Sequence, residues 1–165
     1  MRVRAKSSCL LVLLLVAVVC HGRAAAVDIS MAGTWSVNIG SADLVAGVGS
    51  NLPDAWESET NQGVLAITNT TGDTDNWRVD ISRSDANWPA ALTIYVRRTS
   101  DGVGLGGSIS GGLAYQAVDV DSSAFFSGSG DRTGVDVQLK VTGVSLAIQP
   151  NAYSTSIVYT VVDVP

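Results

Sequence analysis

The stretch "NAYSTSIVYTVVDVP" (residues 151–165) decides the fold class because it consists mostly of β-branched, aromatic and hydroxyl residues. Such residues fit the pleated, half-buried surface of a β-sheet. Side chains alternate along a strand, so Ile157, Tyr159 and Val161 are expected to face a core. Val158 lies on the opposite face and is also apolar, and a strand apolar on both faces needs cover on both. The tail therefore predicts a strand that either closes its own sheet or pairs with a neighbouring chain.

Alternation of apolar and polar residues recurs along the rest of the chain. In "NWRVDIS" (76–82) and "VDVQLKV" (135–141) every second residue is apolar, which is typical of a half-buried strand. No long segment has the 3.6-residue period of a helix. The further predicted strands are residues 33–39, 63–70, 91–98, 123–129, 144–148 and 155–164. The pattern predicts an all-β chain, a single immunoglobulin- or pilin-like antiparallel β-sandwich of seven or eight strands with long glycine-rich loops.

Two long connections interrupt this pattern, residues 41–62 and residues 99–116. The first is expected to hold a short helical turn, with Pro53 at a first helical position. The second is rich in glycine and is predicted to be a long hairpin loop, because glycine permits turns with positive φ. Neither connection resembles a linker between domains, so one domain is predicted.

The beginning of the chain has the three-part form of a secretory signal. A basic start (residues 1–6) is followed by an apolar run (9–20) and by small residues that end at Ala26. The apolar run is shorter than the ~20 residues that a helix needs to span a bilayer. We therefore predict a signal peptide at 1–26 and a single domain at 27–165 that is secreted, either extracellular or at the cell surface.

Removal of the signal changes the charge and the chemistry of the chain. The whole sequence has ten Lys and Arg and fifteen Asp and Glu, and four of the basic residues lie in the signal, so the mature charge is −9. This charge argues against nucleic acid or an anionic membrane as partner. Both cysteines and the single histidine also lie in the signal. Thiol and histidine chemistry is therefore excluded from the mature chain, which shows no catalytic motif and is predicted not to be an enzyme.

Carboxylates are the main chemistry that remains. Glu57 and Glu59, like Asp119 and Asp121, are two residues apart. On a strand each pair would share one face at about 7 Å, near the separation of an acid–base pair. A polar face of an exposed strand or loop explains both pairs equally simply. A small carbohydrate-active hydrolase stays open as a second alternative.

Two other candidate sites lie in loops. Asp73, Asp75 and Asn76 in "GDTDN" gather hard oxygen ligands of the kind that calcium prefers, although Asp-rich turns also arise from turn chemistry alone. Calcium is the one cofactor that the sequence suggests. Asn69 begins an Asn-Thr-Thr sequon and is a candidate glycosylation site.

The four tryptophans divide into two groups. Trp35 and Trp77 lie in alternating strands and are predicted to be in the core. Trp56 and Trp88 lie in loop-like contexts, where exposed rings would stack on sugars or form an interface. These two residues define a candidate ligand surface and an alternative function, a cell-wall or polysaccharide-binding module.

The tail also carries a family resemblance over about 15 of 165 residues. "PNAYSTSIVYTVVDVP" resembles the closing strand of WxL-type cell-wall surface domains, with a Tyr, a Thr/Ser-rich stretch, an aromatic-Thr-aliphatic step and an acidic-x-Pro end in that order. Tyr159 stands where the WxL pattern has Trp, and Val161 where it has Leu; the second, upstream Trp-x-Leu motif of that family has no clear counterpart. The stretch is similar, too, to the closing strand of spore-coat-U-like and other pilin-like sandwiches. The resemblance implies an exported, non-enzymatic surface or fibre protein.

The expected function is therefore a structural subunit of an extracellular filament or surface layer. Such subunits would associate with one another by strand addition, in which main-chain hydrogen bonds form along an open edge and alternate side chains fill pockets. The participating segments would be residues 27–39, the C-terminal strand, or both. The expected interface residues are Ile157, Val158, Tyr159, Val161 and Val162.

Overall fold

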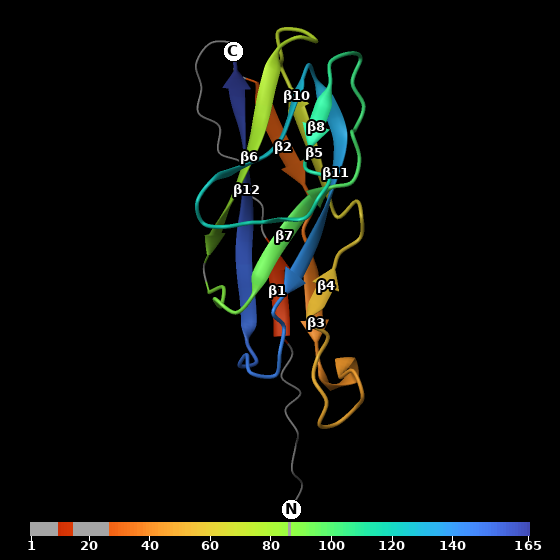
Figure 1. Ribbon diagram of the computed structural model, residues 1–165, viewed down its shortest axis with the longest axis vertical. Helices are drawn as coiled ribbons and strands as arrows, with labels where there is room; N and C mark the ends of the chain where they lie inside the picture. The colour runs from red at the N-terminus through yellow and green to blue at the C-terminus, as the bar shows by residue number, and fades with distance from the viewer. Residues whose placement is uncertain (1–9, 15–26, 86) are drawn as a thin grey trace, which may run out of the picture.

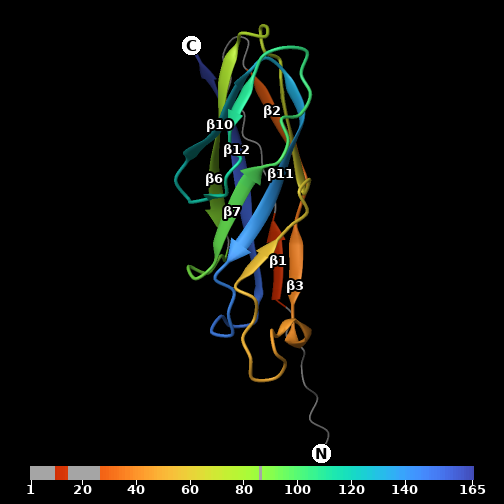
Figure 2. The same cartoon turned by 45° about the vertical axis from the view of Figure 1, so that its right-hand side comes forward.

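A computed structural model describes residues 10–14, 27–85 and 87–165 as an all-β protein of two sheets, an arrangement consistent with a β-sandwich (Figures 1 and 2). In this part of the chain the one helical element is η1 (Ser41–Asp43), a single 3-10 turn. No described helix is long and apolar enough to cross a membrane. Of the predicted signal peptide, only residues 10–14 are among the described residues. The predicted cleavage position at Ala26 lies outside them.

The described residues form twelve strands, more than the seven or eight expected. The strands are β1 (Leu10–Leu14), β2 (Asp28–Ala32), β3 (Ser36–Ile39), β4 (Ala55–Glu57), β5 (Gly63–Thr68), β6 (Asn76–Asp85), β7 (Thr93–Arg98), β8 (Ile109–Gly111), β9 (Gln116–Ala117), β10 (Ser123–Ser129), β11 (Arg132–Thr142) and β12 (Ala152–Val164). Part of the excess comes from the long connections, because β4 and β8 are short strands inside them.

The strands divide between two sheets. Sheet A has the order β3-β1-β12-β6-β10-β8, and sheet B has the order β2-β5-β11-β7-β9. β4 also joins sheet B by pairing with the C-terminal end of β11. All pairs are antiparallel except β1 with β12, which is parallel.

The C-terminal strand lies in the sheet of its own domain. β12 pairs with β6 from Thr155 to Val164, opposite Asp85 to Asn76. This is the longest ladder in the described structure, and it places the tail between β6 and β1 near the middle of sheet A. The core-facing residues Ile157 and Tyr159 of this strand are fully buried, whereas Val158 and Val162 on its other face are half-buried.

The core lies between the two sheets. Ile81 and Tyr159 from sheet A and Leu65 and Ile67 from sheet B are fully buried. Burial of each such side chain is worth about 1.5–3 kcal/mol. The two tryptophans predicted for the core are confirmed there, because Trp35 and Trp77 are both buried.

Trp77 is fixed by a directed contact at each end. Its indole Nε1 donates a hydrogen bond of 2.9 Å to the carbonyl oxygen of Gly130. Its ring meets Phe126 edge to face, with 5.9 Å between ring centroids. A buried indole that has both its polar and its aromatic contacts satisfied stabilises one packing arrangement over others.

Two local predictions are wrong. Residues 144–148 form turns and loop instead of a strand, because β11 ends at Thr142 and Gly143 turns the chain with φ +84°. The helical turn expected near Pro53 is absent, and β4 (Ala55–Glu57) follows instead. Pairing of β4 with β11 recruits this segment into sheet B, an interaction that local sequence cannot reveal.

The glycine-rich loop 99–116 is anchored by one buried cation. The Arg98 side chain points inward from β7 and is 2% exposed. It donates to the carbonyl oxygens of Gly111 and Ser100 and pairs with the Asp101 carboxylate. Its guanidinium also lies 5.9 Å from the centroid of the Phe126 ring. A buried charge that is paired in this way holds the loop against the sandwich.

Candidate functional site

A single strand bridges β3 and β12 in sheet A. β1 runs parallel to β12, with Leu11–Leu14 opposite Ala152–Thr155. On its other side it runs antiparallel to β3, with Leu10–Leu13 opposite Ile39–Ser36. β1 is the only strand that pairs with β3 in the described part of the chain. Figures 1 and 2 both show β1 between these two strands, and we call the position that it occupies the strand slot.

The edge of β12 that faces the slot extends beyond β1. β1 covers this edge only as far as Thr155, and no other strand of the described residues pairs with it from Ser156 to Val164. Protected edges usually carry lysine, proline or a bulge. β12 has no lysine, no proline and one charged residue, Asp163. Its slot-facing edge is therefore long and lacks the usual features that prevent pairing with another chain.

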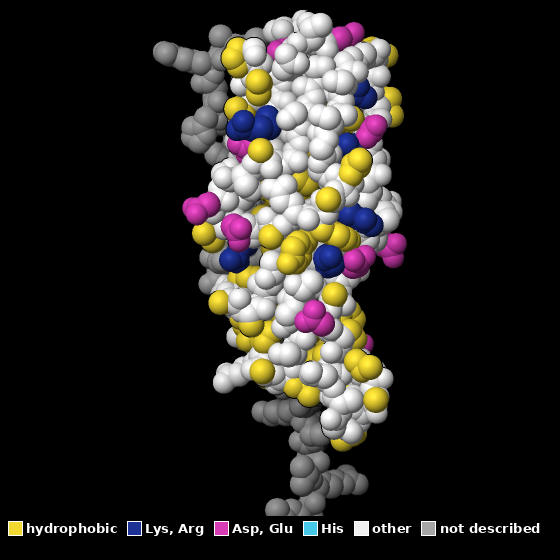
Figure 3. Space-filling view, in the orientation of Figure 1, with side chains coloured by type: hydrophobic (Ala, Val, Ile, Leu, Met, Phe, Trp, Pro, Cys, Tyr) yellow, Lys and Arg dark blue, Asp and Glu magenta, His cyan; other side chains and the backbone are white. Residues whose placement is uncertain are grey.

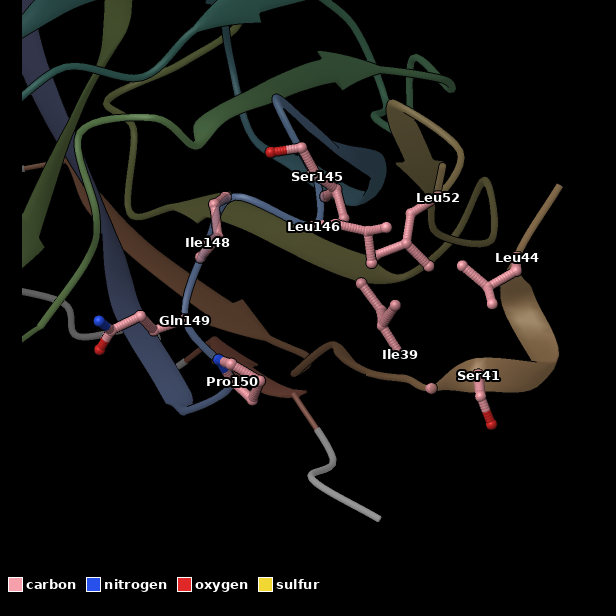
Figure 4. Close-up of a pocket in the computed structure, with 11 residues that line it drawn as sticks. Ile39, Ser41, Leu44, Leu52, Ser145, Leu146, Ile148, Gln149 and Pro150 are labelled. Atoms are coloured by element: carbon pink, nitrogen blue, oxygen red, sulfur yellow. The ribbon is translucent and has the colours of Figure 1, made fainter. Parts of the chain in front are cut away.

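An apolar pocket of about 260 Å³ opens at the end of the slot where β3 ends. Figure 4 shows the side chains of Leu44, Leu52 and Leu146 pointing toward Ile39. The other lining residues include Val144, Ile148 and Pro150, from the loop that precedes β12. Figure 3 shows hydrophobic side chains over the middle of this face and, in smaller groups, toward its lower end, where this loop and η1 lie.

Local hydrogen bonds hold the two loops that line the pocket. The backbone N–H of Gly40 donates to the Asp43 carboxylate at 2.8 Å, which fixes the turn after β3. The Tyr153 hydroxyl donates to the carbonyl oxygen of Gln149 at 2.7 Å, which fixes the loop before β12. Ile39 joins the slot and the pocket, because it lies opposite Leu10 in the ladder and also lines the pocket wall.

The predicted interface residues divide between the core and the outer face. Ile157 and Tyr159 are fully buried, so their side chains belong to the domain's own core. Val161 is half-buried and also packs against the core. Val158 and Val162 are half-buried. Any contact of β12 with another chain would therefore use its backbone edge together with half-buried residues such as Val158 and Val162.

The two tryptophans of the predicted ligand surface, Trp56 and Trp88, are less exposed than expected. Trp88 is buried, and its indole Nε1 donates to the carbonyl oxygen of Leu92 at 2.9 Å. Trp56 is half-buried and packs against the core from β4. Sugar stacking needs an open ring face, and the Trp88 ring would have to leave the core to offer one.

The candidate calcium residues serve the structure of their own turn. The Asp75 carboxylate accepts a hydrogen bond of 2.6 Å from the backbone N–H of Thr71. Asp73 contacts the backbone of the glycine-rich loop at Gly106. Asn76 is the first residue of β6. The described residues contain no group of three or more His, Cys, Asp or Glu that could hold a metal ion.

The glycosylation candidate and the carboxylate pairs all lie at the surface. Asn69 is exposed, has φ 63°, and donates through Nδ2 to the Asp28 carboxylate. The four carboxylates of the two predicted pairs are exposed as well: Glu57, Glu59, Asp119 and Asp121. Exposure of all four side chains agrees with polar faces more simply than with an enclosed acid–base site.

A cluster that was not predicted lies on the outer face of sheet B. The Lys140 ammonium is 3.9 Å from the centroid of the Tyr115 ring and 5.1 Å from that of Tyr95, and the Arg97 guanidinium is 4.6 Å from Tyr115. Burial, followed by the nearby charge of Glu57, raises the pKa of Tyr115. We call these five residues the outer cluster.

Strand register assembles the outer cluster. Tyr95 lies opposite Lys140 in the β7–β11 ladder, and Glu57 lies opposite Lys140 in the β4–β11 ladder. Alternation along β7 does place Tyr95 and Arg97 on one face, which is a signal in the sequence. Nothing in the sequence indicates that β4 and β7 pair with the same segment of β11.

Comparison with known proteins adds no identity to these observations. No protein-family model matches the chain, and no curated protein matches it.

Proposed function

We propose that the mature chain is a non-enzymatic, secreted structural subunit of an extracellular filament or surface layer, and that its copies associate by β-strand addition. The observation that carries this proposal is the strand slot between β3 and β12. β1 lies wholly inside the predicted signal peptide. Export with removal of residues 1–26 would therefore take one strand out of sheet A.

Loss of β1 would leave two open backbone edges. Residues 152–155 of β12 and residues 36–39 of β3 now make their ladders to β1. Without it, their N–H and C=O groups would lie along open edges that can pair with a strand of another chain. A strand from a second copy satisfies both edges at once. The open edge of β12 beyond Thr155 would lengthen that contact.

Strand addition of this kind gives an open-ended assembly. If one copy provides the slot and another provides the strand, the two contact surfaces differ. Such heterologous contacts form filaments or layers unless the rotation between copies closes a ring. The segment 27–32 is the natural donor, because β2 lies at an edge of sheet B and pairs only with β5 among the described strands.

A point substitution on the edge of β12 tests this function. Deletion of residues 153–165 would remove a central strand of sheet A, so loss of assembly would follow from unfolding alone. Val158→Lys places a charge on the half-buried outer face of the open edge, where charge discourages pairing. Val64→Lys is the matched control, because Val64 is an exposed valine on β5, which has neighbours on both sides.

Light scattering and negative-stain microscopy of residues 27–165, with and without calcium, would report the assembly state. We expect filaments or large oligomers for the wild type and for Val64→Lys, and folded monomers for Val158→Lys. A wild-type chain that stays a folded monomer at high concentration would refute the proposal.

A second candidate is polysaccharide binding, and the outer cluster favours it over the tryptophans. Tyr95 and Tyr115 are half-buried aromatic residues beside a carboxylate and two cations. Because Lys140 and Arg97 lie over the Tyr115 ring, a sugar would have to displace one of these cations from the ring face or bind through the polar groups that flank it. Titration with cell-wall oligosaccharides tests this: Tyr115→Ala should abolish binding, whereas Tyr153→Ala, remote from the cluster in the strand order, should leave it intact.

A further inference from the structure

The strand slot has an occupant in the same chain, the apolar segment "LLVLL" of β1. This segment makes two ladders at once, a parallel one with β12 and an antiparallel one with β3. A strand that pairs on both sides satisfies its own main-chain groups and those of both neighbours. β1 therefore occupies the position that an incoming strand from another copy would need.

We propose that Leu10–Leu14 is a blocking strand: it keeps the slot closed in the precursor, and its removal converts the slot into an acceptor for a strand of a second copy. The inference rests on the proposed function and adds its regulation. In the uncleaved chain the slot and β1 belong to one molecule. A tethered segment acts at an effective concentration of the order of millimolar, which favours it over a free competitor by roughly 10²–10⁴.

The position of β1 explains how its removal would affect more than one edge. β3 is held in sheet A through β1 alone among the described strands, so β3 loses its ladder when β1 leaves. The wall of the apolar pocket includes Ile39, the last residue of β3. Loss of β1 therefore exposes the edge of β12, frees β3 and changes the pocket at the end of the slot. These three changes together form an acceptor that is continuous from the pocket to the open edge of β12.

Such a device would separate synthesis from assembly. A precursor with its slot filled leaves open only the edge of β12 from Ser156 to Val164, where a strand of another copy would lack the second ladder that β3 provides, so copies that fold before export would remain monomers. Cleavage of the signal cuts the tether between β1 and the domain, so that the blocking strand can leave the slot together with the rest of the leader. Assembly would then begin only where the leader has been removed.

The test uses the full chain with a protease recognition sequence inserted after Ala26. The uncut chain should be a monomer. After cutting, the leader fragment should co-elute with the domain in gel filtration, and mass spectrometry of that peak identifies it. Dilution or a mild denaturant should release the fragment, and assembly should follow. The uncut chain should remain monomeric at a concentration at least ~100-fold above that at which the fragment-free chain assembles.

Val12→Pro is the decisive variant, because proline lacks the N–H that a strand paired on both sides requires. In this variant the fragment should separate at once after cutting, and the uncut chain should already assemble. Val19→Pro is the matched control, a valine of the same apolar run outside β1, and should behave like the wild type. Release of the wild-type fragment as rapid as that of Val12→Pro would overturn the inference.

A synthetic peptide of residues 8–15 separates failure of this inference from failure of the proposed function. Added to the cut, fragment-free domain, it should raise the midpoint of thermal unfolding and suppress assembly. If the domain assembles but the peptide changes neither quantity, the blocking strand is refuted and the structural-subunit function stands. If the peptide binds but the domain never assembles, the slot is a peptide site and the subunit function is refuted.

Discussion

Tyr159 lies directly opposite Ile81 in the ladder that joins β12 to β6, and both side chains are fully buried. The hydroxyl of Tyr159 is the exception in this contact, because it has no hydrogen-bond partner in the described structure. An unpaired buried hydroxyl costs about 1–3 kcal/mol of desolvation. Phenylalanine would keep the ring and its tilted contact with Phe125 while removing the unpaired group.

We therefore expect Tyr159→Phe to raise the free energy of unfolding by about 1 kcal/mol, measured by urea denaturation. Tyr153→Phe is the control, since the Tyr153 hydroxyl does donate a hydrogen bond, to Gln149. That variant should be neutral or slightly destabilised. A clear loss of stability in Tyr159→Phe would show that its hydroxyl has a partner, such as a buried water molecule.

The same hydroxyl makes stability depend on alkaline pH. Burial raises the pKa of Tyr159 well above its usual value of 10.0. The folded state thus holds the proton more tightly than the unfolded state. The stabilisation that comes from this tighter proton binding is complete below pH 10 and is lost as pH rises above it. The free energy of unfolding then falls by up to about 1.4 kcal/mol per pH unit.

Urea denaturation between pH 8 and pH 11.5 would test this dependence. We expect the wild type to lose stability above pH 10 and Tyr159→Phe to lose less. Some loss should remain in the variant, because burial also raises the pKa of Tyr115. Identical curves for the two proteins would contradict the assignment to Tyr159.

Arg98 should be far more important to stability than Arg78, which forms an ion pair with Asp80 near the surface. Replacement of Arg98 by methionine would leave the carbonyl oxygens of Gly111 and Ser100 without their donors. We expect a loss of at least ~2 kcal/mol and faster proteolysis within the loop 99–116. Arg78→Met is the control, because the Arg78 side chain is 41% exposed in its pair with Asp80. This substitution should lower the free energy of unfolding by less than about 1 kcal/mol. Equal effects of the two substitutions would show that Arg98 does not anchor the loop.

The sequence predicted most of the strands because alternation is a local signal. Trp77, Val79 and Ile81 alternate as expected and are all buried. The pattern failed where pairing partners decide the structure. Residues 144–148 look like a strand, yet Gly143 turns them away from sheet B into the wall of the pocket. β4 is the converse case, a segment with little strand character that the adjacent β11 recruits.

The candidate site was harder to predict because it depends on register between distant segments. The C-terminal strand was predicted from its composition, but its neighbours β6 and β1 lie far away in sequence. The strand slot unites the apolar segment Leu10–Leu14 with a strand that begins at residue 152, and no motif links the two. Trp88 shows the opposite error, since a loop-like context concealed a ring that is buried with its Nε1 hydrogen-bonded.

The turn at Gly143 offers a sharp test of how β11 ends, because two glycines with positive φ can be compared. A Cβ on Gly143 would lie 2.0 Å from the carbonyl oxygen of Ala91, and its φ is +84°. Gly134 has φ +69°, but a Cβ there would meet nothing within 4 Å. Replacement of Gly134 by alanine should therefore lower the free energy of unfolding by about 1–2 kcal/mol, from backbone strain alone. At Gly143 we expect at least twice that loss in urea denaturation, because the clash with Ala91 adds to the strain; equal losses would mean that the chain relaxes around the new methyl group.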